Sequence, residues 1–189
     1  MDILSWLAVN FDHSILQWII NNVRNPLFDF LMPIITIFGD AGIFWIACSV
    51  AMMIFPKTRK TGFAMGLALL MGLLLCNLTL KPLIARPRPY VFFTDIAMYL
   101  TDGESDFSFP SGHTIASFEA ATALLIGNKK LGIPAMILAV LIAFSRLYLC
   151  VHYPTDVLAS VVLGVGLALL ATFLVRKGWA MWESKKNLA

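Results

Sequence analysis

Two histidines and several cations stand in three short polar segments of an otherwise apolar chain. The first segment, residues 81–89, contains Lys81, Arg86 and Arg88, with no acidic residue to pair with them before Asp95. Arginine binds phosphate through two parallel hydrogen bonds and lysine adds a point charge. The segment therefore indicates an anionic ligand, although contact with lipid headgroups would also explain these cations.

The second segment, residues 109–113, has the composition of a helix start that could bind an anion. Ser111 is a good N-cap, and Gly112 lets the backbone approach a ligand closely. The first N–H groups of a helix and its dipole attract negative charge. His113 would then stand beside an anion site, unless the segment is only a capped helix start with an incidental histidine.

The third segment, residues 145–156, combines a second imidazole with a carboxylate. His152 precedes an expected helix and Asp156 lies just inside it. A carboxylate near an imidazole fixes its tautomer and stabilises the cation that forms. Arg146 lies in an apolar run, where a charge is costly and usually functional. A structural pair of Arg146 with Asp156 or Glu119 is the alternative interpretation.

The composition indicates a membrane protein. Of the 189 residues, 59% are hydrophobic and 13% charged, and the mean hydropathy is +0.82. Soluble domains average about 45–50% apolar and about 25% charged residues. The net charge of +3 is too small and scattered to predict nucleic-acid binding. Cys48, Cys76 and Cys150 lie in apolar runs and indicate neither disulfides nor a zinc site.

The apolar runs predict an all-α, polytopic membrane helix bundle with six transmembrane helices. A helix needs about 20 residues to cross a bilayer core about 30 Å thick. Residues 1–24 mix apolar and polar positions, which is typical of an interfacial amphipathic helix. We expect an N-terminal segment 1–24, a membrane domain 25–178 and a cytoplasmic tail 179–189. The expected crossings begin near residues 26, 41, 61, 113, 131 and 157.

Loop charges predict the orientation in the cell (inner) membrane. Basic residues cluster at 57–60, 129–130 and 176–186, on one side if the chain crosses six times. The positive-inside rule makes that side cytoplasmic. Both termini would then be cytoplasmic, and the loops 81–112 and 151–155 would face outward.

The polar segments resemble the type 2 phosphatidic acid phosphatase family (PAP2, or lipid phosphate phosphatases). All three of its elements occur in order with their internal spacing intact and on one predicted membrane face. They are K-x6-R-P at Lys81, Arg88 and Pro89, P-S-G-H at 110–113, and S-R-x5-H-x3-D at Ser145, Arg146, His152 and Asp156.

The resemblance implies a mechanism without metal or other cofactor, and hence independent of magnesium. His152 is at the position of the family's nucleophile, which forms a phosphohistidine, and Asp156 would orient it. His113 resembles the acid that protonates the leaving oxygen and then activates water. The expected phosphate-binding residues are Lys81, Arg88, Ser111, Gly112 and Arg146.

An outward site beside the bilayer predicts a lipid substrate whose phosphate lies in the outer leaflet. The family's small bacterial members include undecaprenyl diphosphate phosphatases and phosphatidylglycerophosphate phosphatases. We expect hydrolysis of undecaprenyl diphosphate to undecaprenyl phosphate and phosphate. Phosphatidylglycerophosphate, phosphatidate and lipid A phosphates remain alternatives. A lipid transporter would bind such a ligand without releasing phosphate, and a purely structural membrane protein would not need these residues.

Four other features have open roles. Arg86 could touch a second phosphate or a lipid headgroup. Glu119 should face the bundle interior near Arg146 or another polar group. The acidic residues 94–108 could form a lid or a solvated loop. His13 is interpreted as a surface residue away from the site.

Overall fold

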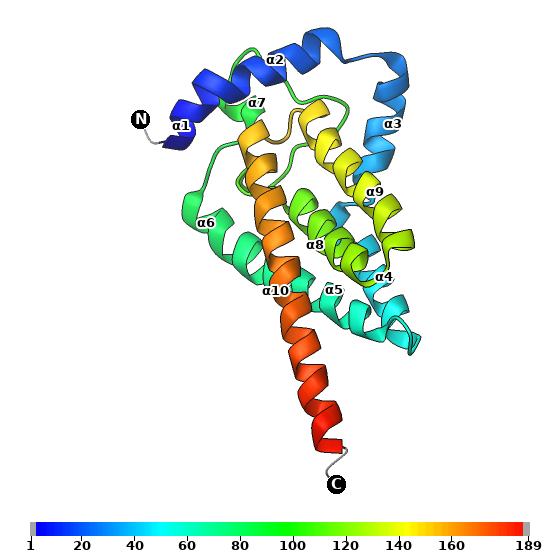
Figure 1. Ribbon diagram of the computed structural model, residues 1–189. Coiled ribbons are helices and arrows are strands. Elements are labelled where there is room, and N and C mark those ends of the chain that lie inside the picture. The colour runs from blue at the N-terminus through cyan, green and yellow to red at the C-terminus, as the bar shows by residue number, and fades with distance from the viewer. Residues whose placement is uncertain (1–2, 187–189) are drawn as a thin grey trace.

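A computed structural model describes residues 3–186, and within this range the chain is all-α (Figure 1). Long helices form a bundle, and the short ones gather with the loops at one of its ends. The helices are α1 (Ile3–Leu7), α2 (His13–Asn22), α3 (Pro26–Ile37), α4 (Ile43–Ile54), α5 (Arg59–Gly72), α6 (Lys81–Ile84), α7 (Pro89–Phe92), α8 (Gly112–Gly127), α9 (Lys129–Tyr148) and α10 (Pro154–Lys186). Two π-helical segments, Ala8–Asp12 and Leu73–Leu80, join α1 to α2 and α5 to α6.

Helix α8 is the centre of the bundle, in contact with α5, α9 and α10. Its buried face includes Ala120, Ala121 and Ala123, whose small side chains let neighbouring helices approach closely. The outer faces are apolar as well, and Val162 of α10, for example, is 72% exposed. Such an apolar exterior suits lipid contact, and the chain is a multi-pass membrane protein.

Three helical stretches are long and apolar enough to cross a bilayer, namely Arg59–Phe92, α9 and α10. Helix α8 has 16 residues and lies among them. Helices α3 and α4 have 12 residues each, so each is about 18 Å long at about 1.5 Å per residue. Neither reaches across a core about 30 Å thick by itself.

The six expected crossings are not all found: residues 3–186 contain three helices long and apolar enough to cross a membrane, or four if α3 and α4 form one span. The axes of these helices differ by only 41° across a short break, and both run in the same direction (Figure 1). The break contains Ala41 and Gly42 with positive φ angles of 48° and 66°, which interrupts the helix without reversing the chain. The turn at 39–42 is therefore a kink between two helices that keep the same general direction, where the sequence suggested a hairpin.

The described ends of the chain lie at opposite ends of the bundle (Figure 1). The N-terminal helices lie across the end that carries the loops, and α10 extends to the other end (Figure 1). Arg86 of the loop region donates a hydrogen bond to the Leu4 carbonyl at 3.2 Å. The sequence predicted that both termini are cytoplasmic; in the structure the described ends of the chain lie apart along the bundle, and the side of the membrane that each faces stays a prediction.

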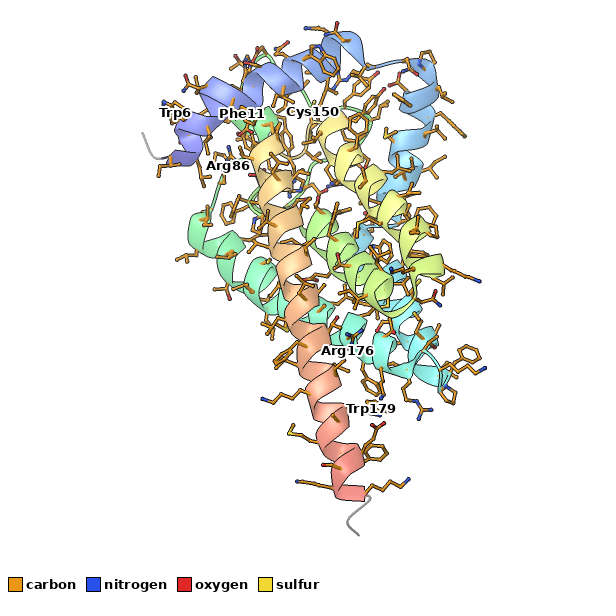
Figure 2. All side chains as sticks on the ribbon, in the orientation of Figure 1. Trp6, Phe11, Arg86, Cys150, Arg176 and Trp179 are labelled. Carbon is orange, nitrogen blue, oxygen red and sulfur yellow. The ribbon has the colours of Figure 1, made fainter. Side chains whose placement is uncertain are left out.

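The three basic clusters do gather at one end of the bundle. Lys60 pairs with Glu183 at 3.2 Å, which joins the start of α5 to the end of α10. A side chain at Gly127, just before the cluster at 129–130, would meet Thr61 beside the cluster at 57–60. Figure 2 shows Arg176 and Trp179 at this end and Arg86 beside the N-terminal helix at the other. Helix α10 continues beyond residue 179 to Lys186, so the expected tail is helical over this stretch.

Candidate active site

Each polar segment lies where a helix begins or ends, at the end of the bundle covered by α1 and α2. Lys81 begins α6 and Arg88 is the N-cap of α7. Ser111 is the N-cap of α8, and its Oγ accepts a hydrogen bond from the Thr114 amide at 3.4 Å. Arg146 lies in the last turn of α9, and His152 follows in the link to α10. Rigid helix termini thus hold all three segments.

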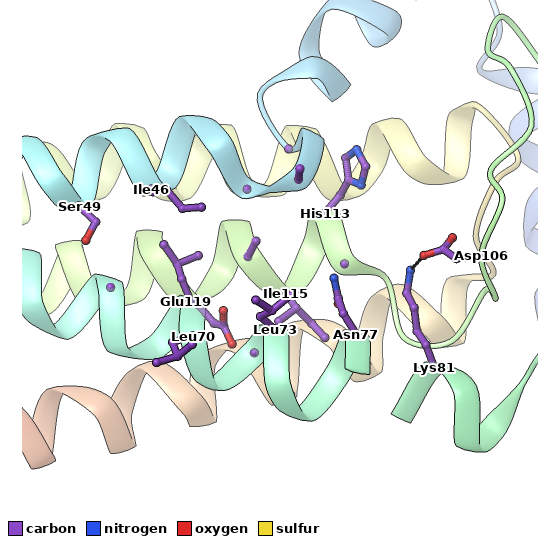
Figure 3. A pocket seen from close by; sticks show the side chains of 18 of the residues that line it. Ile46, Ser49, Leu70, Leu73, Asn77, Lys81, Asp106, His113, Ile115 and Glu119 are labelled. Atoms are coloured by element: carbon purple, nitrogen blue, oxygen red, sulfur yellow. Dashed lines mark hydrogen bonds and ion pairs between the residues drawn. The ribbon is translucent and has the colours of Figure 1, made fainter. Parts of the chain in front are cut away.

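A cavity of about 460 Å³ brings the predicted residues together. Both imidazoles, His113 and His152, line it with Lys81, Arg88 and Gly112 (Figure 3 shows Lys81 and His113). Arg146 joins them indirectly, because Glu104 in the cavity wall pairs with Arg146 and lies 4.0 Å from Arg88. The structure brings both imidazoles, Lys81 and Arg88 to one cavity, whereas Arg146, Ser111 and Asp156 do not line it.

His152 has the surroundings of a neutral nucleophile. Its side chain is 1% exposed, and its Nε2 lies 3.4 Å from Nη1 of Arg88. Burial, reinforced by the positive charges of Arg88, Arg146 and Lys81, lowers the pKa of His152 well below its usual value. The imidazole is therefore unprotonated at neutral pH, which leaves a lone pair for attack on phosphorus.

Asp156 lies near His152 but does not hydrogen-bond to it. Nδ1 of His152 is 3.6 Å from Oδ2 of Asp156, beyond normal hydrogen-bond distance. Asp156 instead accepts hydrogen bonds from Arg86, from Ser108 and from the Tyr153 amide at 3.1 Å. The carboxylate is thus held in place beside the imidazole, at 3.6 Å from Nδ1 and without a direct hydrogen bond to it.

Arg86 is part of the scaffold of the candidate site. It is only 4% exposed, and its guanidinium bridges Asp156 and Asp12 while stacking 3.7 Å from the centre of the Tyr153 ring. Both terminal nitrogens of Arg86, Nη1 and Nη2, donate hydrogen bonds within the protein, so its contacts favour neither of the two roles suggested by the sequence. Asp12 also accepts hydrogen bonds from the Thr155 amide at 2.8 Å and from its hydroxyl at 2.7 Å. The N-terminal helix therefore braces the catalytic end of α10.

The acidic residues of the loop before α8 enter the site, so its cations are not unpaired. Asp106 pairs with both Lys81 and Arg88, and Glu104 pairs with Arg146. Burial raises the pKa of both carboxyl groups, but these cations more than offset it, and each pKa is lowered overall. Two ionised carboxylates therefore occupy the cradle, which is evidence that it accepts oxyanions.

His113 contacts an acidic residue that the sequence reasoning did not select. Its Nε2 is 2.7 Å from Oδ1 of Asp40, in the kink between α3 and α4. The signal for Asp40 was its position in a glycine-flanked turn, and that turn was interpreted only as a connection. His13, by contrast, is 2.9 Å from Asp95 and does not line the cavity.

The cavity continues from the two imidazoles toward the middle of the bundle. Its deeper wall includes Ile46, Leu70 and Leu73, which are 49%, 51% and 48% exposed and so also face the lipid side (Figure 3). Glu119 lies there, 1% exposed, and its Oε1 has no hydrogen-bond partner among the described residues. Glu119 faces the interior as expected, but Arg146 pairs elsewhere, with Glu104 and with Thr36 at 2.7 Å.

Among residues 3–186 we find no group of three or more histidine, cysteine or acidic side chains arranged to hold a metal ion. Independence from magnesium nevertheless remains a prediction, and only an assay tests it.

Comparisons with known proteins cover all three polar segments. A family model described as the PAP2 superfamily matches residues 59–180. An undecaprenyl-diphosphatase of Sulfolobus acidocaldarius is 34% identical over 135 residues, or 71% of this chain and 65% of that protein. An undecaprenyl-diphosphatase of Bacillus subtilis is 31% identical over 142 residues, or 75% of this chain and 72% of that protein.

A solved structure is similar over nearly the whole chain. It is the crystal structure of a transmembrane PAP2 type phosphatidylglycerolphosphate phosphatase from Bacillus subtilis. The TM-score is 0.70 and the identity 30%, with 92% of this chain and 90% of that chain covered. The likeness therefore includes the arrangement of the helices as well as the polar segments.

Proposed function

Because the chain belongs to the PAP2 superfamily, we propose that it is a membrane lipid phosphatase that works through a phosphohistidine intermediate. One observation carries the proposal: both imidazoles, at 113 and 152, line a single cavity with Lys81 and Arg88. The three cations now pair with the carboxylates of Asp106 and Glu104, and the oxygens of a phosphate can replace these carboxylates.

In the first step, Nε2 of His152 attacks phosphorus and the bond to the leaving oxygen breaks. Lys81, Arg88 and Arg146 neutralise the non-bridging oxygens, with Ser111 and the amide of Gly112 completing the cradle. His113 donates its proton to the leaving oxygen. The dephosphorylated lipid departs, and the phosphoryl group stays on His152.

In the second step, water replaces the lipid. His113, now neutral, takes a proton from the water as its oxygen attacks phosphorus, and the phosphorus–nitrogen bond breaks. Inorganic phosphate and free His152 result, and His113 is protonated again for the next cycle. Asp156 stabilises the imidazole of His152 through its charge at 3.6 Å.

The proposed substrate is undecaprenyl diphosphate, converted to undecaprenyl phosphate and phosphate. Two undecaprenyl-diphosphatases among the relatives support it, as does a cavity whose deeper wall is apolar and reaches the lipid side. The second candidate is phosphatidylglycerophosphate, which the name of the similar solved structure favours. Comparing the turnover of the two lipids by the purified protein separates these candidates.

We propose that the site faces outward and the basic clusters face the cytoplasm of the cell membrane. Helices α3 and α4 together, the stretch from α5 to α6, and α8, α9 and α10 would each cross once. The N-terminal helix would then lie on the outer surface over the site, with exposed Trp6, Phe11 and Trp18 in the interface. This replaces the layout in which both termini are cytoplasmic.

Phosphate release by the purified protein in detergent containing EDTA tests the activity. We expect full activity without added metal, and none from His152→Ala, whose helix content and melting temperature should stay close to those of the wild type. A protein that binds the lipid but releases no phosphate is a transporter or a binding protein. Activity that depends on added magnesium would contradict the metal-free mechanism.

A further inference from the structure

We infer that Asp40 is a positioning residue for His113, which fixes the imidazole so that Nδ1 exchanges protons with the substrate. Oδ1 of Asp40 lies 2.7 Å from Nε2 of His113. A hydrogen bond at one ring nitrogen assigns the proton and leaves the other nitrogen for chemistry. The inference rests on the proposed role of His113 as the general acid.

The kink between α3 and α4 is shaped to receive the imidazole. A side chain at Gly39 would place its Cβ 2.6 Å from Cδ2 and 3.1 Å from Cβ of His113, so the ring packs directly on this backbone. Ala41 and Gly42 have positive φ angles, which turn the chain immediately after Asp40. Because α3 and α4 both anchor this turn, the Asp40 carboxylate is held by the scaffold as well as by its hydrogen bond.

The other charges around His113 come from different elements and act differently. Arg146 approaches from α9 and Glu104 from the loop before α8, and these two pair with each other. An entering phosphate must replace Glu104 on Arg146, so the negative charge supplied by Glu104 leaves when substrate binds. Asp40 contacts Nε2 of His113, whereas Nδ1 is the nitrogen proposed to face the substrate. Asp40 does not pair with any of the phosphate-binding cations. It can therefore remain in contact throughout the cycle.

The proton transfers then balance around one ring. Protonated His113 donates from Nδ1 to the leaving oxygen, while its Nε2–H stays bonded to Asp40. Neutral His113 accepts a proton from water at Nδ1 in the second step. The carboxylate of Asp40 stabilises the imidazolium form without itself becoming protonated, as in other carboxylate–histidine pairs.

Leaving groups of different basicity test this role. An alkyl phosphate such as phosphatidate needs a proton on its leaving oxygen, whereas p-nitrophenyl phosphate releases a stable anion without one. We expect Asp40→Ala to slow phosphate release from phosphatidate by about tenfold or more. This is part of the rate acceleration of about 10²–10⁴ that a general acid typically provides. The pre-steady-state burst of nitrophenolate should change less than threefold. Asp40→Asn should lie between the wild type and Asp40→Ala, and exposed Asp102→Ala should behave as the wild type.

A double variant separates positioning from a structural role. In the His113→Ala background, Asp40→Ala should cause no further loss, because the ring on which it acts is gone. The inference would be overturned if Asp40→Ala slowed both substrates equally. It would also be overturned if Asp40→Ala reduced activity as much in the His113→Ala background as in the wild type. If Asp40→Ala does not fold, Asp40→Asn gives the same comparison with the side-chain volume retained. If His113→Ala slows phosphatidate and p-nitrophenyl phosphate equally, His113 is not the general acid, whatever the result for Asp40.

Discussion

At the scale of single residues, two carboxylates occupy the cations that are proposed to bind the substrate phosphate. Glu104 pairs with Arg146 and Asp106 with Lys81 and Arg88. The same cations lower the pKa of both carboxyl groups, so the acids are ionised at neutral pH. In the proposed mechanism, a substrate phosphate displaces these carboxylates before it reaches His152.

Glu104→Gln should therefore strengthen substrate binding. Glu104 is 29% exposed, so solvent partly screens its ion pair with Arg146. Loss of this ion pair should make binding of the substrate phosphate to Arg146 more favourable by about 0.7 kcal/mol. We expect a KM about threefold lower in steady-state phosphate-release assays, since 1.4 kcal/mol corresponds to about tenfold. Asp102→Asn, in the same loop, is the control and should leave KM unchanged. A higher KM for Glu104→Gln would mean that Glu104 aligns Arg146 for the substrate.

The sequence identified the residues at this scale whose partners lie close by in the chain. Ser111 caps the helix that begins directly after it. Arg146, His152 and Asp156 lie close together because only a short link joins the end of α9 to the start of α10. Arg86 and Asp12 pair across 74 positions. No local pattern predicts such a contact, because it depends on where the N-terminal helix docks.

At the scale of elements, the N-terminal helix is part of the active-site scaffold. Asp12 has no exposed surface and bonds Arg86 and Thr155, and Arg86 in turn holds Asp156. A chain of contacts thus runs from the π-helical segment before α2 to Asp156, which lies 3.6 Å from His152. The mixture of apolar and polar positions predicted an amphipathic interfacial helix for residues 1–24, and the pattern did not indicate that one of its polar residues, Asp12, is buried.

Asp12→Ala should loosen this brace. Breaking a buried ion pair by removing one partner costs about 3–5 kcal/mol, because the remaining charge stays buried. We expect a clearly lower melting temperature in detergent and a lower kcat with lipid phosphate. Asn10→Ala is the matched control, since Asn10 is exposed on the same helix and its side chain bonds only the Trp6 carbonyl. A melting temperature and a kcat equal to those of the wild type would show that the brace is dispensable.

At the scale of the whole molecule, one kink changes the orientation of the N-terminal region. Apolar runs predicted helices over the stretches that α3, α4, α5, α8, α9 and α10 occupy, yet they could not distinguish a hairpin from a bend at residues 39–42. That choice depends on backbone angles at Ala41 and Gly42 and on how the kink packs against α8. A hairpin there would add a crossing and place the N-terminal helix at the other end of the bundle, away from the loops.

Labelling of single added cysteines in intact cells tests the orientation. We expect a membrane-impermeant maleimide to modify Asp102→Cys and Ser14→Cys from outside, and Lys130→Cys only after permeabilisation, because α2 and the loop before α8 share one end. The wild-type chain is the background control, since Cys76 and Cys150 are buried and Cys48 is half-buried. A layout with both termini in the cytoplasm requires Ser14→Cys to behave like Lys130→Cys. That result would contradict the broken span and remove the N-terminal helix from the outer surface over the site.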